Sequence, residues 1–310
     1  MIVLEFKVKA KEQQYRAIEE AVRTTQFIRN KCLRFWMDSK QVGRYDLNKY
    51  CKILANDFAF VGELNSMARQ SAAERAWSAI CRFLDSCKRK LSGKRVYPKF
   101  KQNVHSVEYK STGWKLDRTT CKHITFTDKK NIGRLKLIGT HELRFYEDKL
   151  IKRVRLIRKA NGYYCQFSIA VSNQESVKPT GMSIGLSVGD RHAYTDSKRH
   201  IEPKLDHSKS IKRLAKLQRR ISKKFVLGAE SNNYKKAKRK LALLQFKISR
   251  QREEWAKRVA RCVCKSADLI AYEDLKLQDI ANHDSPRNRS FPRQKKQGKM
   301  EHSTIAMSIH

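Results

Sequence analysis

Several features that would place a protein at a membrane are missing from this sequence. Among its 310 residues no apolar run approaches the roughly 18 residues that a transmembrane helix requires. The first residues have neither the basic start nor the length of a secretory signal peptide. We therefore expect a cytoplasmic protein with no membrane partner.

Cysteine and histidine patterns that bind metals are also missing. The eight cysteines form no C-x-x-C pair, and the nine histidines form no H-E-x-x-H or other paired spacing. We interpret the cysteines, including Cys262 and Cys264, as reduced residues at apolar positions of helices and strands. Zinc is therefore not expected, and no cofactor is predicted.

Acidic residues are scarce as well. The chain has 30 Asp+Glu against 69 Lys+Arg, a formal net charge of +39. Residues 209–265 alone contain 20 lysines and arginines against three glutamates, unlike the mixed charges of an ordinary solvated helix. Such self-repulsion favours a polyanionic partner, and we predict that this partner is nucleic acid.

The first third of the chain combines one strand with a helical segment. Residues 2–8 alternate apolar and polar side chains, which predicts a strand. From Lys11 to about Leu91 the apolar residues recur at helical spacing, for example at Ile18, Val22 and Ile28. We expect a helical bundle inserted after one strand, with basic residues such as Arg29 on outer faces that could meet a nucleic-acid backbone.

Strand patterns return at residues 97–101, 104–110, 123–127, 134–138, 152–158 and 163–171, and Asn161-Gly162 favours a tight hairpin between the last two. Short strands at this spacing suggest a small antiparallel barrel whose first strand is residues 2–8. Basic and aromatic residues interleave on the expected strands, a composition suited to contacting an RNA backbone. The basic candidates are Lys99, Lys101, Lys110, Arg153 and Arg155.

Two further apolar stripes predict a pair of antiparallel basic helices. The first stripe runs from Ile211 to Ile221 and the second from Ala237 to Cys262, with a polar turn at residues 228–233 between them. The basic residues that lie off these stripes are the main candidates for phosphate contacts. They are Lys212, Arg213, Arg219, Arg220, Lys223, Lys224, Lys235, Lys236 and Arg239.

Residues 182–188 alternate between an apolar and a small polar face, and Ser187 lies on the polar face. The segment resembles the first strand of an RNase H-like (RuvC-type) nuclease core, in which that position holds a metal-binding aspartate. A neutral hydroxyl cannot supply the anionic oxygens that Mg²⁺ prefers. The strand-like residues 269–275 carry Glu273, the candidate for the second acid.

The order of these parts resembles the TnpB family of RNA-guided nucleases, which small insertion sequences encode and which are related to type V CRISPR effectors. The resemblance covers about residues 1–290. It is carried by the Tyr-Pro-x-Phe-Lys motif at 97–101, the Gly185-x-x-x-Gly189 strand, the Leu-Gln-Arg-Arg-Ile-Ser-Lys-Lys segment at 217–224 and the Tyr-Glu-Asp-Leu segment at 272–275.

The resemblance implies an α+β multidomain fold. A wedge β-barrel would comprise residues 1–10 and 96–172, a helical recognition insertion residues 11–95, and a linker residues 173–181. An incomplete RNase H-like (RuvC) α/β domain with the basic helical hairpin would comprise residues 182–289, followed by an unrelated tail at 290–310.

Three departures from the family bear on activity: Ser187 replaces the first acid, and both the zinc ribbon and the segment with the third acid are missing. Asp190 would need a different backbone path to replace the lost ligand. We interpret the chain as a nuclease-inactive prokaryotic protein, monomeric on its guide RNA, that binds RNA and, guided by it, double-stranded DNA. It would be associated with the nucleoid when bound.

Two alternatives stay open at this point. The chain could be an active RNA-guided endonuclease or transposition accessory protein that requires Mg²⁺, with its acids elsewhere. It could also be the product of a decayed insertion-sequence copy, truncated after about Arg289 and without a function.

Overall fold

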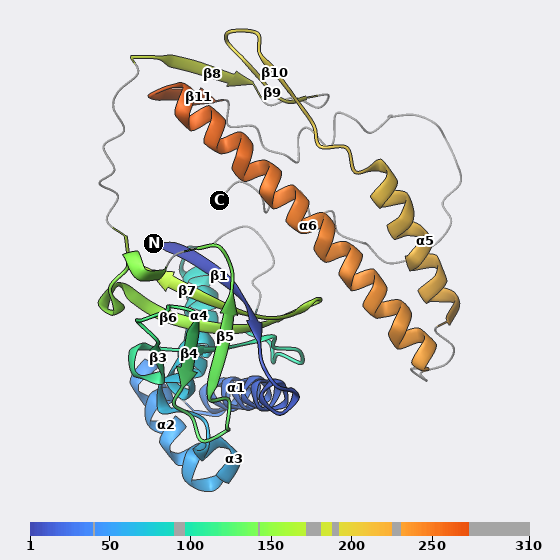
Figure 1. Cartoon of the computed structure of the whole chain (residues 1–310). Helices are drawn as coiled ribbons and strands as arrows, with labels where there is room; N and C mark the ends of the chain where they lie inside the picture. The colour runs from blue at the N-terminus through green and yellow to red at the C-terminus, as the bar shows by residue number, and fades with distance from the viewer. Residues whose placement is uncertain are drawn as a thin grey trace. The chain divides into compact units, whose positions relative to one another are not determined.

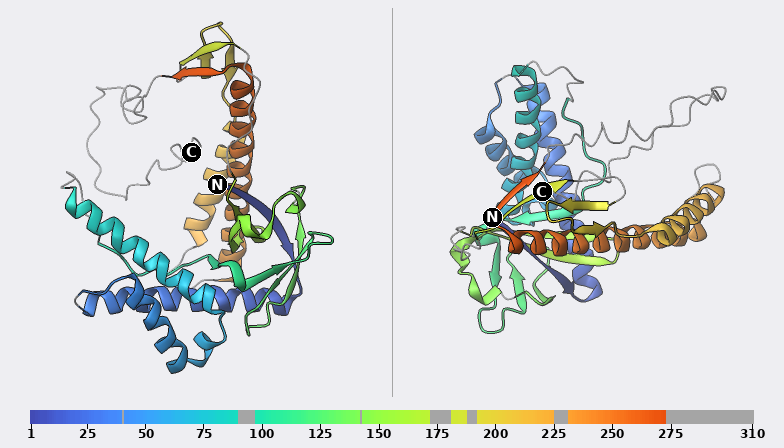
Figure 2. Two further views of the ribbon diagram at one scale, coloured as in Figure 1. Left: turned by 90° about the vertical axis from the view of Figure 1, so that its left-hand side faces the viewer. Right: turned by 90° about the horizontal axis from the view of Figure 1, so that it is seen from above.

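The computed structural model describes residues 1–39, 41–89, 97–141, 143–171, 181–187, 192–224 and 231–272, with Lys224 described by its backbone alone. The chain divides into two compact units, Met1–Gln174 and Glu175–His310. Both are shown in Figures 1 and 2.

The first unit is built on a seven-stranded sheet in the order β2-β6-β7-β1-β5-β4-β3, in which every ladder is antiparallel. The strands are β1 (Ile2–Lys9), β2 (Ser106–Tyr109), β3 (Trp114–Leu116), β4 (His123–Phe126), β5 (Arg134–Ile138), β6 (Ile151–Lys159) and β7 (Gly162–Ile169). The expected barrel is therefore wrong in one respect. The sheet curls into a half-barrel whose edges, β2 and β3, share no ladder among the described residues.

The N-terminal strand β1 lies inside this sheet, between β5 and β7. Phe6 pairs with Cys165 of β7, and Val8 pairs with Leu137 of β5. Phe6 and Val8 are buried, whereas Lys7 and Lys9 between and beyond them are exposed. The alternation seen in the sequence thus separates the core face of the sheet from its outer face.

Four helices follow β1: α1 (Glu12–Asp38), α2 (Arg44–Asp57), the single turn α3 (Ala59–Gly62) and α4 (Ser66–Lys88). The predicted stripe of α1 is confirmed, since Ile18, Val22 and Ile28 are buried. α1 and α4 pack against each other and against β2, so the helices and the sheet share one core.

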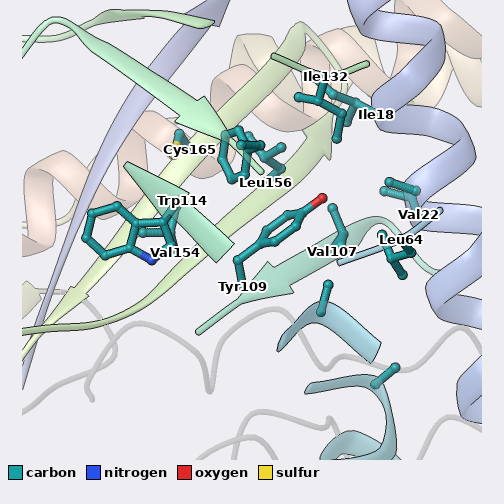
Figure 3. Close-up of a cluster of buried hydrophobic side chains, with 14 of the residues drawn as sticks. Ile18, Val22, Leu64, Val107, Tyr109, Trp114, Ile132, Val154, Leu156 and Cys165 are labelled. Atoms are coloured by element: carbon teal, nitrogen blue, oxygen red, sulfur yellow. The ribbon is translucent and has the colours of Figure 1, made fainter. Parts of the chain in front are cut away.

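Tyr109 of β2 occupies the centre of this core, between side chains from the helices and from the sheet (Figure 3). Its ring lies near Val107 and Leu64, and its hydroxyl donates a hydrogen bond of 2.6 Å to Asp128. Burial raises the pKa of Tyr109 well above its usual range, and the Asp128 carboxylate adds to this. A hydroxyl buried so deeply needs such a partner.

The expected strand at residues 97–101 does not form. Residues 97–105 form no regular secondary structure, and several of their backbone groups bond to side chains of α1. The Asn30 amide bonds the carbonyl and the N–H of Lys101 at 2.9 and 3.0 Å, and Arg29 donates to the Lys99 carbonyl at 3.3 Å. Arg29 is consequently only 7% exposed and does not lie on an outer face, contrary to expectation.

The second unit contains a four-stranded sheet in the order β10-β9-β8-β11. Its strands are β8 (Ser183–Ser187), β9 (His192–Asp196), β10 (Ile201–Pro203) and β11 (Leu269–Tyr272). β8, β9 and β10 are antiparallel neighbours, and β11 pairs with β8 in parallel. A parallel neighbour requires a long crossover, which the two helices between β10 and β11 provide.

Those helices are α5 (Ser208–Lys224) and α6 (Asn232–Ser266), and they pack against each other as the predicted antiparallel pair (Figures 1 and 2). Ser231 caps the start of α6, and its hydroxyl accepts a hydrogen bond of 3.2 Å from the Tyr234 N–H. The contact face is thin. Ala237, Ile248 and Val263 are buried on α6, whereas Ile211 on α5 is half exposed.

The prediction for the cysteines holds in part. All eight are free; Cys32, Cys51 and Cys165 are buried, but Cys262 and Cys264 are exposed on α6, where Val263 between them faces the core. None of the described helices is long and apolar enough to cross a membrane.

The two sheets differ in how much apolar surface they bury, and this predicts different hydrogen-exchange rates. β7 buries Cys165, Phe167 and Ile169, whereas β8 buries only Ile184 and its neighbour β11 leaves Tyr272 72% exposed. We expect the amides of β8 to exchange faster than those of β7, on the order of 100-fold, because local opening there exposes less new surface. Mass spectrometry of peptides 183–187 and 162–169 measures this, and equal protection would contradict it.

Candidate nucleic-acid interface

The basic residues of α5 project away from its apolar stripe. Lys212, Arg213, Arg219, Arg220 and Lys223 are all exposed, and the partly buried Leu214, Leu217 and Ile221 face the other way. Within the described ranges no carboxylate lies at ion-pair distance from these five cations. Their charges are therefore uncompensated at the surface.

The N-terminal part of α6 continues this surface. Lys235, Lys236 and Arg239 are exposed and likewise have no ion-pair partner among the residues that the structure covers. The described acids of the hairpin lie farther along α6, where Glu253 pairs with Arg250 at 3.7 Å and Lys257 at 2.7 Å. The hairpin surface is the set of eight exposed cations without such a pair: Lys212, Arg213, Arg219, Arg220, Lys223, Lys235, Lys236 and Arg239.

The basic residues of the first unit have a different environment, because two poorly exposed carboxylates bind them. Glu108 of β2, whose side chain is 3% exposed, accepts from Arg153 at 2.6 Å and from Arg155 at 2.6 Å. Arg75 of α4 approaches it to 3.3 Å. The register explains the pair with Arg155, since Glu108 lies opposite Arg155 in the β2–β6 ladder.

Glu74 of α4 forms the second centre of this cluster. Its carboxylate contacts Lys110 at 2.7 Å, Arg44 at 2.5 Å and Arg153 at 3.3 Å. Arg153 thus connects Glu74 with Glu108, and the network joins α2, α4, β2 and β6. Because both carboxylates lie on the core side of the cations, the pairs tie the helices to the sheet.

The protonation of Glu108 shows how strongly the cluster holds this charge. Burial alone would raise its pKa, but the hydrogen bonds from Arg153 and Arg155 and the charge of Arg75 outweigh it and lower the pKa to about 2. For Glu74 burial acts in the same upward direction, and the bonds from Lys110 and Arg44 lower its pKa below the usual range. Both carboxylates are therefore ionised at neutral pH.

The candidates predicted from the sequence thus divide into two groups. Lys110, Arg153 and Arg155 are held by carboxylates, and their role in binding nucleic acid stays a prediction. Lys99 and Lys101 are exposed on the irregular segment that bonds to α1 instead of on a strand. Sequence reasoning missed Glu74 and Glu108, and the register of β2 against β6 that brings Glu108 to Arg155 could not be read from the sequence.

The candidate nuclease position lies at the end of β8. Ser187 is exposed and pairs with Thr195 of β9. Tyr272, the last described residue of β11, lies opposite Leu186. Glu273 follows Tyr272 in the chain but lies outside the described residues, as does Asp190. In the part of the chain that the structure covers, no three His, Cys, Asp or Glu side chains are grouped to hold a metal ion.

Part of the chain is similar to known proteins. A family model described as "Probable transposase", OrfB_IS605, matches residues 166–284. The putative RNA-guided DNA endonuclease InsQ of Escherichia coli (strain K12) is 26% identical over 188 residues. The chain is thus similar to proteins of the TnpB family. The alignment covers 60% of this chain and 44% of InsQ, so the chain spans less than half of that relative's length.

Among solved structures, a chain of the CRISPR-Cas12f ternary complex, determined by cryo-electron microscopy, aligns with 84% of this chain and 64% of its own length. The TM-score is 0.31 and the sequence identity is 16%. The TnpB family comprises transposon-associated proteins of the RNA-guided nuclease type.

The two groups of cations predict opposite effects of mutation. Arg155→Ala should lower the free energy of unfolding of the first unit by about 1–2 kcal/mol, because it leaves Glu108 buried with fewer donors. Arg219→Ala removes an exposed, unpaired charge and should change stability by less than about 0.5 kcal/mol. Urea titration followed by tryptophan fluorescence compares the variants. Equal destabilisation by both would contradict the distinction.

Proposed function

We propose that this TnpB-like chain is a prokaryotic, cytoplasmic nucleic-acid-binding protein that holds a guide RNA and through it double-stranded DNA, without cleaving the DNA. The hairpin surface is the observation that carries this proposal. No carboxylate among the described residues lies at ion-pair distance from its eight exposed cations, so an external polyanion is the partner that their chemistry favours. Blocking access to the bound DNA would then be its activity.

The arrangement of the hairpin favours backbone contacts over base reading. Lysines and arginines along two packed helices present a line of charge that matches the repeated phosphates of a nucleic-acid strand. The described part of α5 contains no aromatic side chain that could stack on a base. Sequence specificity would therefore come from pairing between the guide RNA and its target, as in RNA-guided systems generally.

The position of Ser187 supports the lack of cleavage. β11 lies parallel to β8, after three antiparallel strands and a helical crossover, as in the RNase H-like cores that the sequence resembles. Two Mg²⁺ ions about 4 Å apart need several carboxylates, and the Ser187 hydroxyl brings none to the end of β8. Asp196, opposite Leu186, accepts a 2.7 Å hydrogen bond from the His200 N–H and shapes the β9–β10 turn.

An active nuclease is the second candidate, and one observation favours it. The β8–β11 register sets Tyr272 opposite Leu186, and Glu273 is the next residue of the chain. One acid would thus follow the strand beside Ser187. Mg²⁺ would be required in this case, but the described residues do not fit a magnesium site, so we derive no catalytic step through the metal.

Binding to RNA should depend steeply on salt, because each phosphate contact releases counterions. For the Arg219→Ala/Arg220→Ala variant we expect an affinity roughly tenfold below wild type at low salt and a slope of log K against log salt that is flatter by about 0.7 per lost contact. Fluorescence anisotropy with a single-stranded RNA measures both. The control, Lys115→Ala/Lys122→Ala, removes the same charge from exposed positions of the first unit. Wild-type affinity that is independent of salt would refute the proposal.

Guide-dependent cleavage should be undetectable with Mg²⁺ or Mn²⁺. Purified protein, a cognate guide RNA and matched DNA are incubated and analysed on a denaturing gel. Ser187→Asp alone should also remain inactive, because one restored carboxylate does not complete a two-metal site. Nicks in wild type that disappear in Glu273→Ala would establish the second candidate instead.

A further inference from the structure

A shallow cavity of about 410 Å³ lies on the first unit, where the end of β1 and the start of α1 meet β4 and β5. Its lining contains four lysines and arginines and no acid. The lining residues are Lys9, Ala10, Lys11, Gln14, His123, Arg134 and Lys136. The hairpin surface contributes none of them, so this is a separate concentration of positive charge.

The strand register places like charges face to face in this cavity. Lys9 of β1 lies directly opposite Lys136 of β5, and Lys136 lies opposite His123 of β4. All three side chains are on the outer face, because the residues beside them, such as Val8 and Leu135, are buried. Like charges directly opposite each other on neighbouring strands destabilise a sheet, so this row lowers stability unless an anion covers it.

The carboxylates that the structure describes do not neutralise this repulsion. Asp117 pairs with Arg134 at 2.9 Å and lies 3.9 Å from His123. Lys9, Lys11 and Lys136 have no carboxylate at ion-pair distance in the described ranges. The cavity therefore presents three uncompensated ammonium groups.

The wall of the cavity is fixed by hydrogen bonds before any ligand arrives. The Gln14 amide donates to the carbonyls of Ile132 at 2.8 Å and Arg134 at 3.0 Å, and its oxygen accepts from the Lys11 N–H at 3.0 Å. These bonds hold the first turn of α1 against the loop that precedes β5. The positive end of the helix dipole of α1 adds to the field of the lysines.

We propose that this cavity binds a phosphate group of a nucleic-acid backbone, as a contact separate from the hairpin surface. The inference rests on the proposed nucleic-acid binding and adds a site to it. Lysine ammonium groups are compact charges that attract a phosphate without reading sequence. An anion between Lys9, Lys11 and Lys136 would also remove the repulsion across the strands.

The test is the full chain with Lys9→Gln and Lys136→Gln, assayed against a single-stranded RNA. We expect an affinity about five- to tenfold below wild type and a salt slope that is flatter by about 0.7. The matched control is Lys7→Gln with Lys115→Gln, which removes the same charge from exposed strand positions outside the cavity. The control should bind within about twofold of wild type.

A second measurement shows whether the variant is folded and whether the repulsion exists. Without ligand, the melting temperature of the Lys9→Gln/Lys136→Gln protein should equal that of wild type or exceed it by up to roughly 3 °C, because the like charges are gone. A lower melting temperature would mean that these lysines stabilise the sheet, and it would overturn the inference.

The remaining outcomes separate this inference from the proposed function. Equal losses in the cavity variant and the control would show that total charge alone matters, and the site would be rejected. Wild-type affinity in the cavity variant would also reject it, while weaker binding by Arg219→Ala/Arg220→Ala would still support the proposed function. If wild type binds no RNA, the proposed function fails. In that case inorganic phosphate can still test the site. A melting temperature that phosphate raises in wild type but not in the cavity variant would support the site, and no such difference would reject it.

Discussion

The ionic cluster around Glu108 is the interaction on which much of the first unit depends. A carboxylate with so little exposure is tolerated because three arginines from α4 and β6 surround it, and removing one would leave charge without compensation. Glu74 extends the cluster to α2 and to Lys110. The cluster thus fixes helices that lie between β1 and β2 in the chain to the sheet. The strands of that sheet come from before and after these helices.

The same cluster decides where positive charge remains available. The chain has too few acids to neutralise its cations, so each buried carboxylate removes basic residues from the set that can bind a polyanion. Arg153 and Arg155 pair with Glu108, whereas no carboxylate in the described part of the chain lies at ion-pair distance from Arg219 and Arg220 on α5. Net charge thus indicates the class of partner, but ion pairing indicates which surface can meet it.

Much of the architecture could be predicted from pattern alone. Alternation at residues 2–8 and 134–138 and the helical period from Ile18 onward match β1, β5 and α1. The conformation of residues 97–101 could not be predicted in this way. These residues alternate as in a strand, but Asn30 and Arg29 of α1 bond to their backbone. A short extended segment pairs with whichever polar groups the tertiary structure brings near it, and its own residues do not specify them.

By itself, the sequence determined the excess of basic residues, their concentration in the helical hairpin, and the serine at the end of β8. Only the tertiary structure decided that the sheet remains an open half-barrel, that Glu108 meets Arg155, and that Lys9 faces Lys136. The physical reason is that charges interact over a few ångströms, whereas these residues are far apart in the chain. Strand register sets their distances, and register follows from the packing of the whole core.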